Sequence, residues 1–343
     1  MSEKIGVVLF NLGGPLSIDD IEEFLFNLFM DPYIIEIPLR GFPRRALARF
    51  IARRRAGKTA HYYEVMGGKS PQYELTMKQA SALEKRLNEH FCAGGTAATG
   101  GDVKVYVGMR YFKPTIKDVY GTLLKDGIQN VILLPLYPHY SRTTTLSSFA
   151  EWNSVAKNLN GRMKVLQIES YHDYPLYIDA VAQRIGEALS RFLSGIRSTV
   201  HILFSAHGVP ERVIMRGDPY QRQIMETVNL VSEEYSNPHS LAYQSRVGPV
   251  KWLGPATLDE IKRLAVNGVK NLLVVPISFV SEHSETLYEV DHLFRREAKQ
   301  AGIEHFEMMP ALNDSPKFIE ALSQLVIDKV KEFNIHGSDL QQE

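Results

Sequence analysis

A segment that occurs twice constrains the fold of this chain more than any other feature. Residues 126–135 (DGIQNVILLP) and residues 267–276 (NGVKNLLVVP) match at an offset of 141 residues. Each copy ends in an apolar run, and a helical pattern precedes it. Helical patterns that alternate with buried strands predict parallel βαβ units. We therefore expect an α/β fold of two Rossmann-like halves, each a parallel β-sheet flanked by helices.

The helical patterns before the two copies carry start and stop signals. Thr115 and Thr257 stand where the patterns begin, and a threonine hydroxyl can cap a helix N-terminus. Gly127 and Gly268 stand where the patterns end, and glycine readily adopts the left-handed conformation that stops a helix. Both halves are therefore expected to contain the order helix, turn, strand.

The repeat also suggests how the chain divides. We assign residues 1–137 to the N-terminal half, together with residues 310–334, a C-terminal helix that packs back on it. Residues 138–309 form the second half. Ligands of open α/β sheets bind beyond the carboxyl ends of the strands, so we expect an active-site cleft between the two halves.

Charge and cysteine content exclude several classes of protein. The 39 basic and 39 acidic residues balance, which gives no general electrostatic reason to expect a nucleic-acid partner. The single Cys92 excludes an internal disulfide framework and a cysteine-ligated iron–sulfur cluster. No apolar run reaches about 18 residues, and the N-terminus lacks the pattern of a secretory signal. We expect a soluble, cytoplasmic protein.

Familiar nucleotide and metal motifs are broken or incomplete. The GGKS of residues 67–70 imitates the end of a phosphate-binding loop, but Tyr63 stands where the first glycine belongs. Pro71 argues against the helix that should follow. His283 and Glu285 lack the paired cysteines that a zinc deaminase needs. These observations remove the commonest functions of this fold class.

Polar side chains follow two apolar runs in the second half. His207 directly follows one run, and neutral imidazole both accepts protons near pH 7 and binds divalent metal ions. After the other run, four polar residues would share one face of an α-helix: Glu282, Glu285, Glu289 and His292. Taken alone, each site also fits a structural histidine or a carboxylate that complements a helix dipole.

The segment LFSAHGVPERVIMRGDPY (residues 203–220) resembles the signature of ferrochelatases, which insert ferrous iron into a porphyrin in the last step of haem biosynthesis. Further matches run along nearly the whole chain: residues 11–15 (NLGGP), 67–71 (GGKSP), 108–111 (GMRY), 137–141 (YPHYS), 243–249 (YQSRVGP), 252–255 (WLGP) and 284–289 (SETLYE). The resemblance implies a chelatase-like fold and a lyase that releases two porphyrin N–H protons.

The resemblance also implies roles for individual residues. His207 and Glu285 would carry the metal and proton steps, and which of them acts first stays open. An acidic relay for iron or protons would consist of Glu282, Glu289 and Asp291. The porphyrin cleft would be lined by Leu12, Arg110, Tyr111, Tyr137 and Trp252. Fe²⁺ would be a substrate, with no tightly bound cofactor and no iron–sulfur cluster.

An apolar segment and a basic segment adjoin in the first half. Residues 24–39 are rich in Phe, Leu and Ile and resemble the lip over the family's active site. No acidic residue occurs between Glu36 and Glu64, and this stretch is rich in arginine. Such a helix could rest peripherally on the inner face of the cytoplasmic membrane or contact an enzyme that delivers the porphyrin. A solvated helix face near the porphyrin carboxylates fits equally well.

Alternative functions stay open at this point. One is coproporphyrin as the substrate of a ferrochelatase, and another is a different tetrapyrrole metal chelatase, such as one that inserts cobalt. A more remote alternative is a tetrapyrrole carrier without catalysis. The presence of both His207 and Glu285 argues against the carrier, since a carrier needs neither a base nor a metal ligand.

Overall fold

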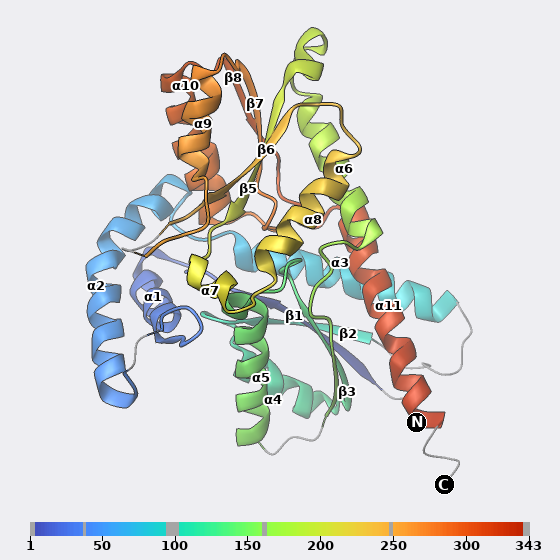
Figure 1. Cartoon of the computed structure of the whole chain (residues 1–343). Coiled ribbons are helices and arrows are strands. Elements are labelled where there is room, and N and C mark those ends of the chain that lie inside the picture. The colour runs from blue at the N-terminus through green and yellow to red at the C-terminus, as the bar shows by residue number, and fades with distance from the viewer. Residues whose placement is uncertain (1–3, 37–38, 94–102, 160–162, 247–249, 339–343) are drawn as a thin grey trace.

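The computed structural model describes residues 4–36, 39–93, 103–159, 163–246 and 250–338, and it contains two four-stranded parallel sheets (Figure 1). The first sheet has the order β2-β1-β3-β4. Its strands are β1 (Ile5–Asn11), β2 (Val103–Met109), β3 (Asn130–Pro135) and β4 (Lys164–Gln167). All of its pairings are parallel, as the βαβ pattern predicted.

The second sheet repeats this arrangement with the order β6-β5-β7-β8. Its strands are β5 (His201–His207), β6 (His239–Gln244), β7 (Asn271–Val275) and β8 (His305–Met308). The two copies of the repeated segment contribute β3 and β7, which hold equivalent positions in their sheets. The predicted α/β fold with two Rossmann-like halves is confirmed.

Helices flank both sheets (Figure 1). Up to β4 they are η1 (Ile18–Asp20), α1 (Ile21–Met30), α2 (Gly41–Val65), α3 (Gln72–Ala93), α4 (Ile116–Asp126), η3 (Arg142–Leu146) and α5 (Ser147–Asn158). The later ones are α6 (Pro175–Leu189), η4 (Ser194–Thr199), α7 (Glu211–Met215), α8 (Tyr220–Ser232), α9 (Thr257–Val266), η5 (Glu285–Phe294), α10 (Arg295–Ala301) and α11 (Pro316–Ser338). Both η3 and η5 are π-helices.

The start and stop signals of α4 and α9 are confirmed in part. Thr115 caps α4 in a capping box with Asp118, and Gly127 ends α4 with a left-handed φ of 70°. Gly268 after α9 is also left-handed, with φ 87°. The predicted cap at Thr257 is wrong, because this residue is the first of α9 and makes no cap. Its hydroxyl instead lies 2.8 Å from Ser205 Oγ.

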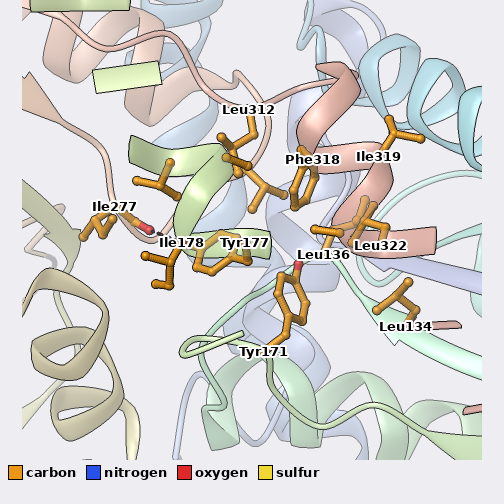
Figure 2. Close-up of a cluster of buried hydrophobic side chains, with 14 of the residues drawn as sticks. Leu134, Leu136, Tyr171, Tyr177, Ile178, Ile277, Leu312, Phe318, Ile319 and Leu322 are labelled. Carbon is orange, nitrogen blue, oxygen red and sulfur yellow. Dashed lines mark hydrogen bonds between the residues drawn. The ribbon is translucent and has the colours of Figure 1, made fainter. Parts of the chain in front are cut away.

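One continuous core joins the two sheets (Figure 2). It includes Leu134 of β3 and Phe204 of β5, and α6 and α11 contribute Tyr177 and Phe318 between them. Helix α11 packs against both α6 and α3. The shared apolar burial couples the placement of the two sheets, so the residues at their strand ends are held in a defined relation.

The first sheet continues beyond the boundary predicted at residues 137 and 138. Strand β4 pairs with β3, so the first sheet ends at Gln167 and the second begins at His201. The division into domains stays a prediction. Among the described residues, no helix is long and apolar enough to span a bilayer. Of the predicted lip, residues 37 and 38 lie outside the described part of the chain.

Candidate active site

The second sheet changes direction between β5 and β7. From β5 the chain moves outward to β6, and from β7 it moves outward to β8 on the opposite side. Ligands of open parallel sheets bind at such a switch point, beyond the carboxyl ends of the strands. His207 is the last residue of β5, and Glu285 begins η5 in the connection that follows β7. The topology therefore brings these two residues together.

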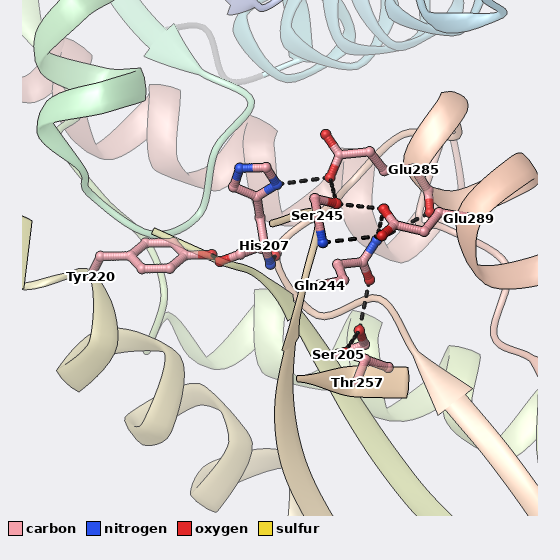
Figure 3. A network of polar contacts seen from close by, with 9 residues as sticks. Ser205, His207, Tyr220, Gln244, Ser245, Thr257, Glu285 and Glu289 are labelled. Atoms are coloured by element: carbon pink, nitrogen blue, oxygen red, sulfur yellow. Dashed lines mark hydrogen bonds and ion pairs between the residues drawn. The ribbon is translucent and has the colours of Figure 1, made fainter. Parts of the chain in front are cut away.

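His207 and Glu285 are in direct contact (Figure 3). Nδ1 of His207 lies 2.7 Å from Oε2 of Glu285. The two side chains are 38% and 27% exposed, so both remain accessible to a reactant. The second ring nitrogen of His207, Nε2, points away from Glu285 (Figure 3). This arrangement leaves Nε2 and the outer carboxylate oxygen, Oε1, as the groups that can meet a metal ion.

The two side chains shift each other's pKa in opposite directions. Burial would lower the pKa of His207, but the charge and hydrogen bond of Glu285, and the charge of Glu289, raise it above its usual value. Burial would raise the pKa of Glu285, but the charge and hydrogen bond of His207 hold it well below its usual value. The two shifts therefore favour the charged forms, a protonated imidazole beside an ionised carboxylate.

A second carboxylate joins the pair through Ser245 (Figure 3). Ser245 Oγ lies 2.5 Å from Oε2 of Glu285 and 2.5 Å from Oε2 of Glu289. A hydroxyl has one proton and donates to only one of the two carboxylates. Burial and the charge of Glu285 raise the pKa of Glu289 above its usual value, so a shared proton at the second contact is favoured by this environment.

Neighbouring side chains hold His207 from behind. Its backbone N–H donates to Ser278 Oγ at 2.7 Å, and its carbonyl accepts from Tyr220 OH at 2.9 Å. Gly208 lets the end of β5 approach β6, since a Cβ there would lie 2.8 Å from the carbonyl oxygen of Gln244. These contacts fix the imidazole on a rigid strand end.

The structure separates the members of the predicted relay. Glu289 belongs to the hydrogen-bonded network, whereas Glu282 precedes η5 and accepts from the backbone N–H of Ala311 at 2.8 Å. Asp291 pairs with Arg295 at 2.6 Å. The predicted α-helical face is therefore wrong for Glu282. Helix η5 begins only at Glu285, and its π geometry takes more residues per turn than an α-helix.

The residues predicted to line the porphyrin cleft follow strand ends of the first sheet, with one exception. Leu12 follows β1, Arg110 and Tyr111 follow β2, and Tyr137 lies two residues beyond β3. The exception, Trp252, forms an isolated bridge with Pro210, close to His207 in the chain. Their contact with a porphyrin stays a prediction.

Two of these residues are held by a buried carboxylate. Arg110 Nη2 lies 3.0 Å from Oδ2 of Asp31, and Tyr111 OH donates to the same oxygen at 2.6 Å. Ser147 Oγ also donates to it. Asp31 ends α1, so this cluster fastens α1 to the first sheet. Arg110 is therefore already paired in the ligand-free protein.

Comparison with known proteins identifies the family. A model of the ferrochelatase family matches residues 4–330. The chain belongs to the ferrochelatase family. The ferrochelatase of Aquifex aeolicus is 50% identical over 95% of this chain and 100% of its own length. That of Geotalea uraniireducens is 48% identical over 95% of this chain and 98% of its own length.

Membership in the ferrochelatase family confirms the predicted enzyme class, a lyase that inserts a metal into a porphyrin. Among solved structures, SirB from Bacillus subtilis with Fe³⁺ matches with a TM-score of 0.55. The match covers 95% of each chain at 11% sequence identity, so it bears on the fold alone. It agrees with the two parallel sheets seen here.

Within the described parts of the chain, no group of three or more His, Cys, Asp or Glu side chains is arranged to hold a metal ion. Resident zinc sites have three or four protein ligands. His207 and Glu285 supply two groups of the kinds that bind metals, fewer than a resident zinc site has.

The sequence motifs did not single out two residues beside this ferrochelatase site. Ser245 lay inside a family match but had no assigned role, and Tyr63 entered only as a mismatch to a phosphate loop. Burial raises the pKa of Tyr63 to about 12, Ser284 lowers it through a hydrogen bond, and the charge of Glu285 raises it. Helix α2 thus reaches the site, where its Tyr62 also stacks on Tyr288 at 4.3 Å.

Proposed function

We propose that the chain inserts Fe²⁺ into protoporphyrin IX, and that His207 and Glu285 carry the metal and proton steps. The observation that carries this proposal is the 2.7 Å contact between the two side chains at the β5–β7 switch point. Free-base porphyrin holds two inner N–H protons, and both must leave when the metal enters. A histidine and a carboxylate in contact offer two proton acceptors and two metal ligands.

The protonation of the pair sets an order of events. The carboxylate of Glu285 favours a proton on His207 in the ligand-free protein, and an imidazolium can neither bind a metal nor accept a pyrrole proton. An approaching dication repels the positive charge of the imidazolium. This repulsion favours release of the imidazole proton to solvent. The neutral imidazole then presents Nε2, while the Glu285 carboxylate supplies negative charge. Each porphyrin N–H bond that breaks transfers its proton to one of these bases and leaves its electron pair on nitrogen for the metal.

Anaerobic metallation tests the roles of the pair. Wild type, His207→Ala and Glu285→Gln are mixed with protoporphyrin and Fe²⁺, and haem formation is followed by absorbance. We expect haem from wild type, loss of turnover in both variants, and porphyrin binding retained in all three by fluorescence quenching. His305→Ala and Glu304→Gln are matched controls at the exposed end of β8. Turnover by either site variant at the wild-type rate would refute the assignment.

The same assay separates the remaining alternatives. Coproporphyrin has more carboxylates than protoporphyrin and would be preferred by a pocket with more unpaired cations. Arg110 is already neutralised by Asp31, which favours the less charged substrate. A higher kcat/KM with coproporphyrin would replace protoporphyrin as the proposed substrate. Porphyrin binding without insertion of iron, zinc or cobalt by the wild type would support the carrier instead.

We further propose that the reaction needs no tightly bound cofactor and no iron–sulfur cluster. Metal insertion exchanges two protons for a dication and transfers no electrons, so no redox group is required. The single cysteine, Cys92, cannot supply the several thiolates that such a cluster takes. Full activity of metal-stripped protein on addition of Fe²⁺ and porphyrin alone is the expected result.

We also propose a cytoplasmic protein whose helix α2 touches an anionic membrane surface. Phe42 is 82% exposed and Phe50 is 57% exposed, and arginines surround them on the same helix. Exposed aromatic rings among cations suit the interface of an anionic bilayer. Flotation with phosphatidylserine vesicles should carry wild type upward but leave the triple variant Arg53→Ser, Arg54→Ser and Arg55→Ser behind. Equal flotation would favour the solvated helix face.

A further inference from the structure

Ser245 stands where β6 gives way to the loop, and it contacts both active-site carboxylates. Its hydroxyl lies 2.5 Å from Oε2 of Glu285 and 2.5 Å from Oε2 of Glu289. Its backbone N–H donates to Oε1 of Glu289 at 3.1 Å. One residue therefore binds both oxygens of Glu289 and one oxygen of Glu285 (Figure 3).

The backbone of Ser245 takes an uncommon conformation to make these contacts. Its φ is 64°, in the left-handed region that glycine occupies freely and other residues rarely adopt. A serine in such a conformation persists only where its surroundings hold it, and such residues cluster at functional sites. A glycine at this position would avoid the backbone strain. The serine has in addition a hydroxyl that contacts Glu285 and Glu289.

The hydroxyl acts on the same oxygen of Glu285 that His207 contacts. Oε2 of Glu285 accepts from His207 Nδ1 and from Ser245, which places its hydrogen bonds on one side of the carboxylate. Oε1 is thereby left to face outward, together with Nε2 of His207. Without the hydroxyl, the carboxylate could turn about its terminal torsion, which is broad for glutamate.

Gln244 ties this arrangement to the strand that carries His207. Its amide N–H group donates to the backbone carbonyl of Glu285 at 3.1 Å and to Oε2 of Glu289 at 3.3 Å. Its amide oxygen accepts from Ser205 Oγ of β5 at 2.7 Å. Residues 244 and 245 thus connect β5 to η5 by side-chain contacts, and they set the position of the glutamates relative to His207.

We propose that Ser245 is a positioning residue for metal insertion, whose hydroxyl holds Glu285 and Glu289 so that Oε1 of Glu285 and Nε2 of His207 face the incoming ion. This inference rests on the proposed roles of His207 and Glu285. Ser245 orients a ligand and touches neither metal nor porphyrin. The residue class is specific: glycine would relieve the backbone but lose the contact, and alanine would lose the contact and keep the strain.

The variants Ser245→Gly and Ser245→Ala separate the hydroxyl from the backbone. Ser240→Ala, in β6, is the control, because its hydroxyl contacts His201 and Glu260 and neither His207 nor the two glutamates. Turnover with Fe²⁺ gives kcat and KM for metal and porphyrin, and Zn²⁺ binding is measured without porphyrin. We expect both Ser245 variants to lose at least tenfold in kcat, and to bind Zn²⁺ more weakly. Porphyrin KM and melting temperature should stay near those of wild type.

A double variant tests whether Ser245 and Glu289 act as one unit. If the hydroxyl works by holding the two carboxylates together, the losses from Ser245→Gly and Glu289→Gln should not add. The combined variant should then be no slower than the slower single variant. Additive losses, wild-type kcat in Ser245→Gly, or parallel losses of porphyrin binding and melting temperature would each overturn the proposal.

The Zn²⁺ measurement keeps this inference distinct from the proposed function. If wild type binds Zn²⁺ but inserts no metal into any porphyrin, the proposed function fails while the effect of Ser245 on metal affinity is still measured. If wild type is active and Ser245→Gly binds Zn²⁺ as well as wild type does, the inference fails while the proposed function stands.

Discussion

The imidazole of His207 and the carboxylate of Glu285 are in direct contact across the switch point of the second sheet, with Nδ1 2.7 Å from Oε2. They come from the end of β5 and from the start of the π-helix after β7, 78 positions apart in the chain. Because β5 and β7 are adjacent parallel strands, their carboxyl ends lie side by side. The contact follows from sheet order.

Glu285→Gln should lower the pKa of His207. The carboxylate is what raises this pKa, and burial alone would depress it. In the variant the side chain stays buried while the charge and hydrogen bond of Glu285 are gone, so the pKa of His207 should fall below that of wild type even though the charge of Glu289 still raises it. Titration of the His207 ring proton by NMR measures the shift. A pKa that stays at the wild-type value in the variant would show that Glu285 does not set it.

The same pair should stabilise the fold over a defined pH range. The pKa of His207 is raised on folding, so its contribution is present below about pH 6.5 and is lost as the pH rises through the folded pKa. The pKa of Glu285 is depressed, so its contribution is present above about pH 4.5 and is lost as the pH falls. The stability difference between wild type and Glu285→Gln, from urea unfolding, should therefore be largest between about pH 4.5 and 6.5.

His139 should make the fold sensitive to acid. Burial, with a smaller effect of His172, lowers its pKa to about 3, and its Nε2 lies 2.9 Å from Thr227 Oγ1. Below about pH 6.5 the histidine binds a proton in the unfolded chain but not in the folded chain. The free energy of unfolding therefore falls by at most about 1.4 kcal/mol for each unit by which the pH is lowered. His139→Gln should flatten this slope between pH 6 and 4. Equal slopes in the two proteins would contradict the prediction.

Asp31→Asn should destabilise the fold by about 3 kcal/mol, because the largely buried guanidinium of Arg110 loses its nearer carboxylate and keeps only Glu151, at 3.8 Å. Asp31 is 2% exposed and accepts hydrogen bonds from Arg110, Tyr111 and Ser147. Urea unfolding measures the loss. Asp19→Asn, on the exposed start of the same region, should change stability by no more than about 0.5 kcal/mol. Similar losses in both variants would contradict a specific role for Asp31.

The repeated segment predicted most of the fold from sequence. A helix that ends at a glycine and is followed by an apolar run can be recognised from neighbouring residues alone. Both copies of the segment form strands, β3 and β7, in equivalent positions of their sheets. The cap at Thr257 could not be predicted in the same way. Its hydroxyl meets Ser205 of β5, a residue 52 positions away, and this tertiary contact outweighs the local capping preference.

The candidate site was predictable where a residue ends a strand and not where it depends on loop geometry. His207 ends an apolar run, so its position was apparent. The π-helix η5 was not, because the sequence spacing was interpreted with the 3.6-residue α period, which placed Glu282 on the wrong element. Ser245 has no periodic signal, since its contacts depend on a left-handed φ after β6.

The separation of the predicted relay gives a ranking of its acidic residues. Glu289 joins Glu285 through Ser245, whereas Asp291 pairs with Arg295 and is 43% exposed. Glu289→Gln removes one titratable carboxyl group from the network and should lower kcat about tenfold or more. Asp291→Asn breaks an exposed ion pair of small energy and should lower it less than about threefold.

Anaerobic assays with Fe²⁺ and porphyrin measure kcat for both variants, and porphyrin binding is the control for folding. Equal losses in the two variants would mean that protons or iron pass along the outer face of η5 through Asp291. A loss confined to Glu289→Gln would show that Glu289, and not Asp291, acts together with Glu285, the carboxylate to which the Ser245 hydroxyl joins it.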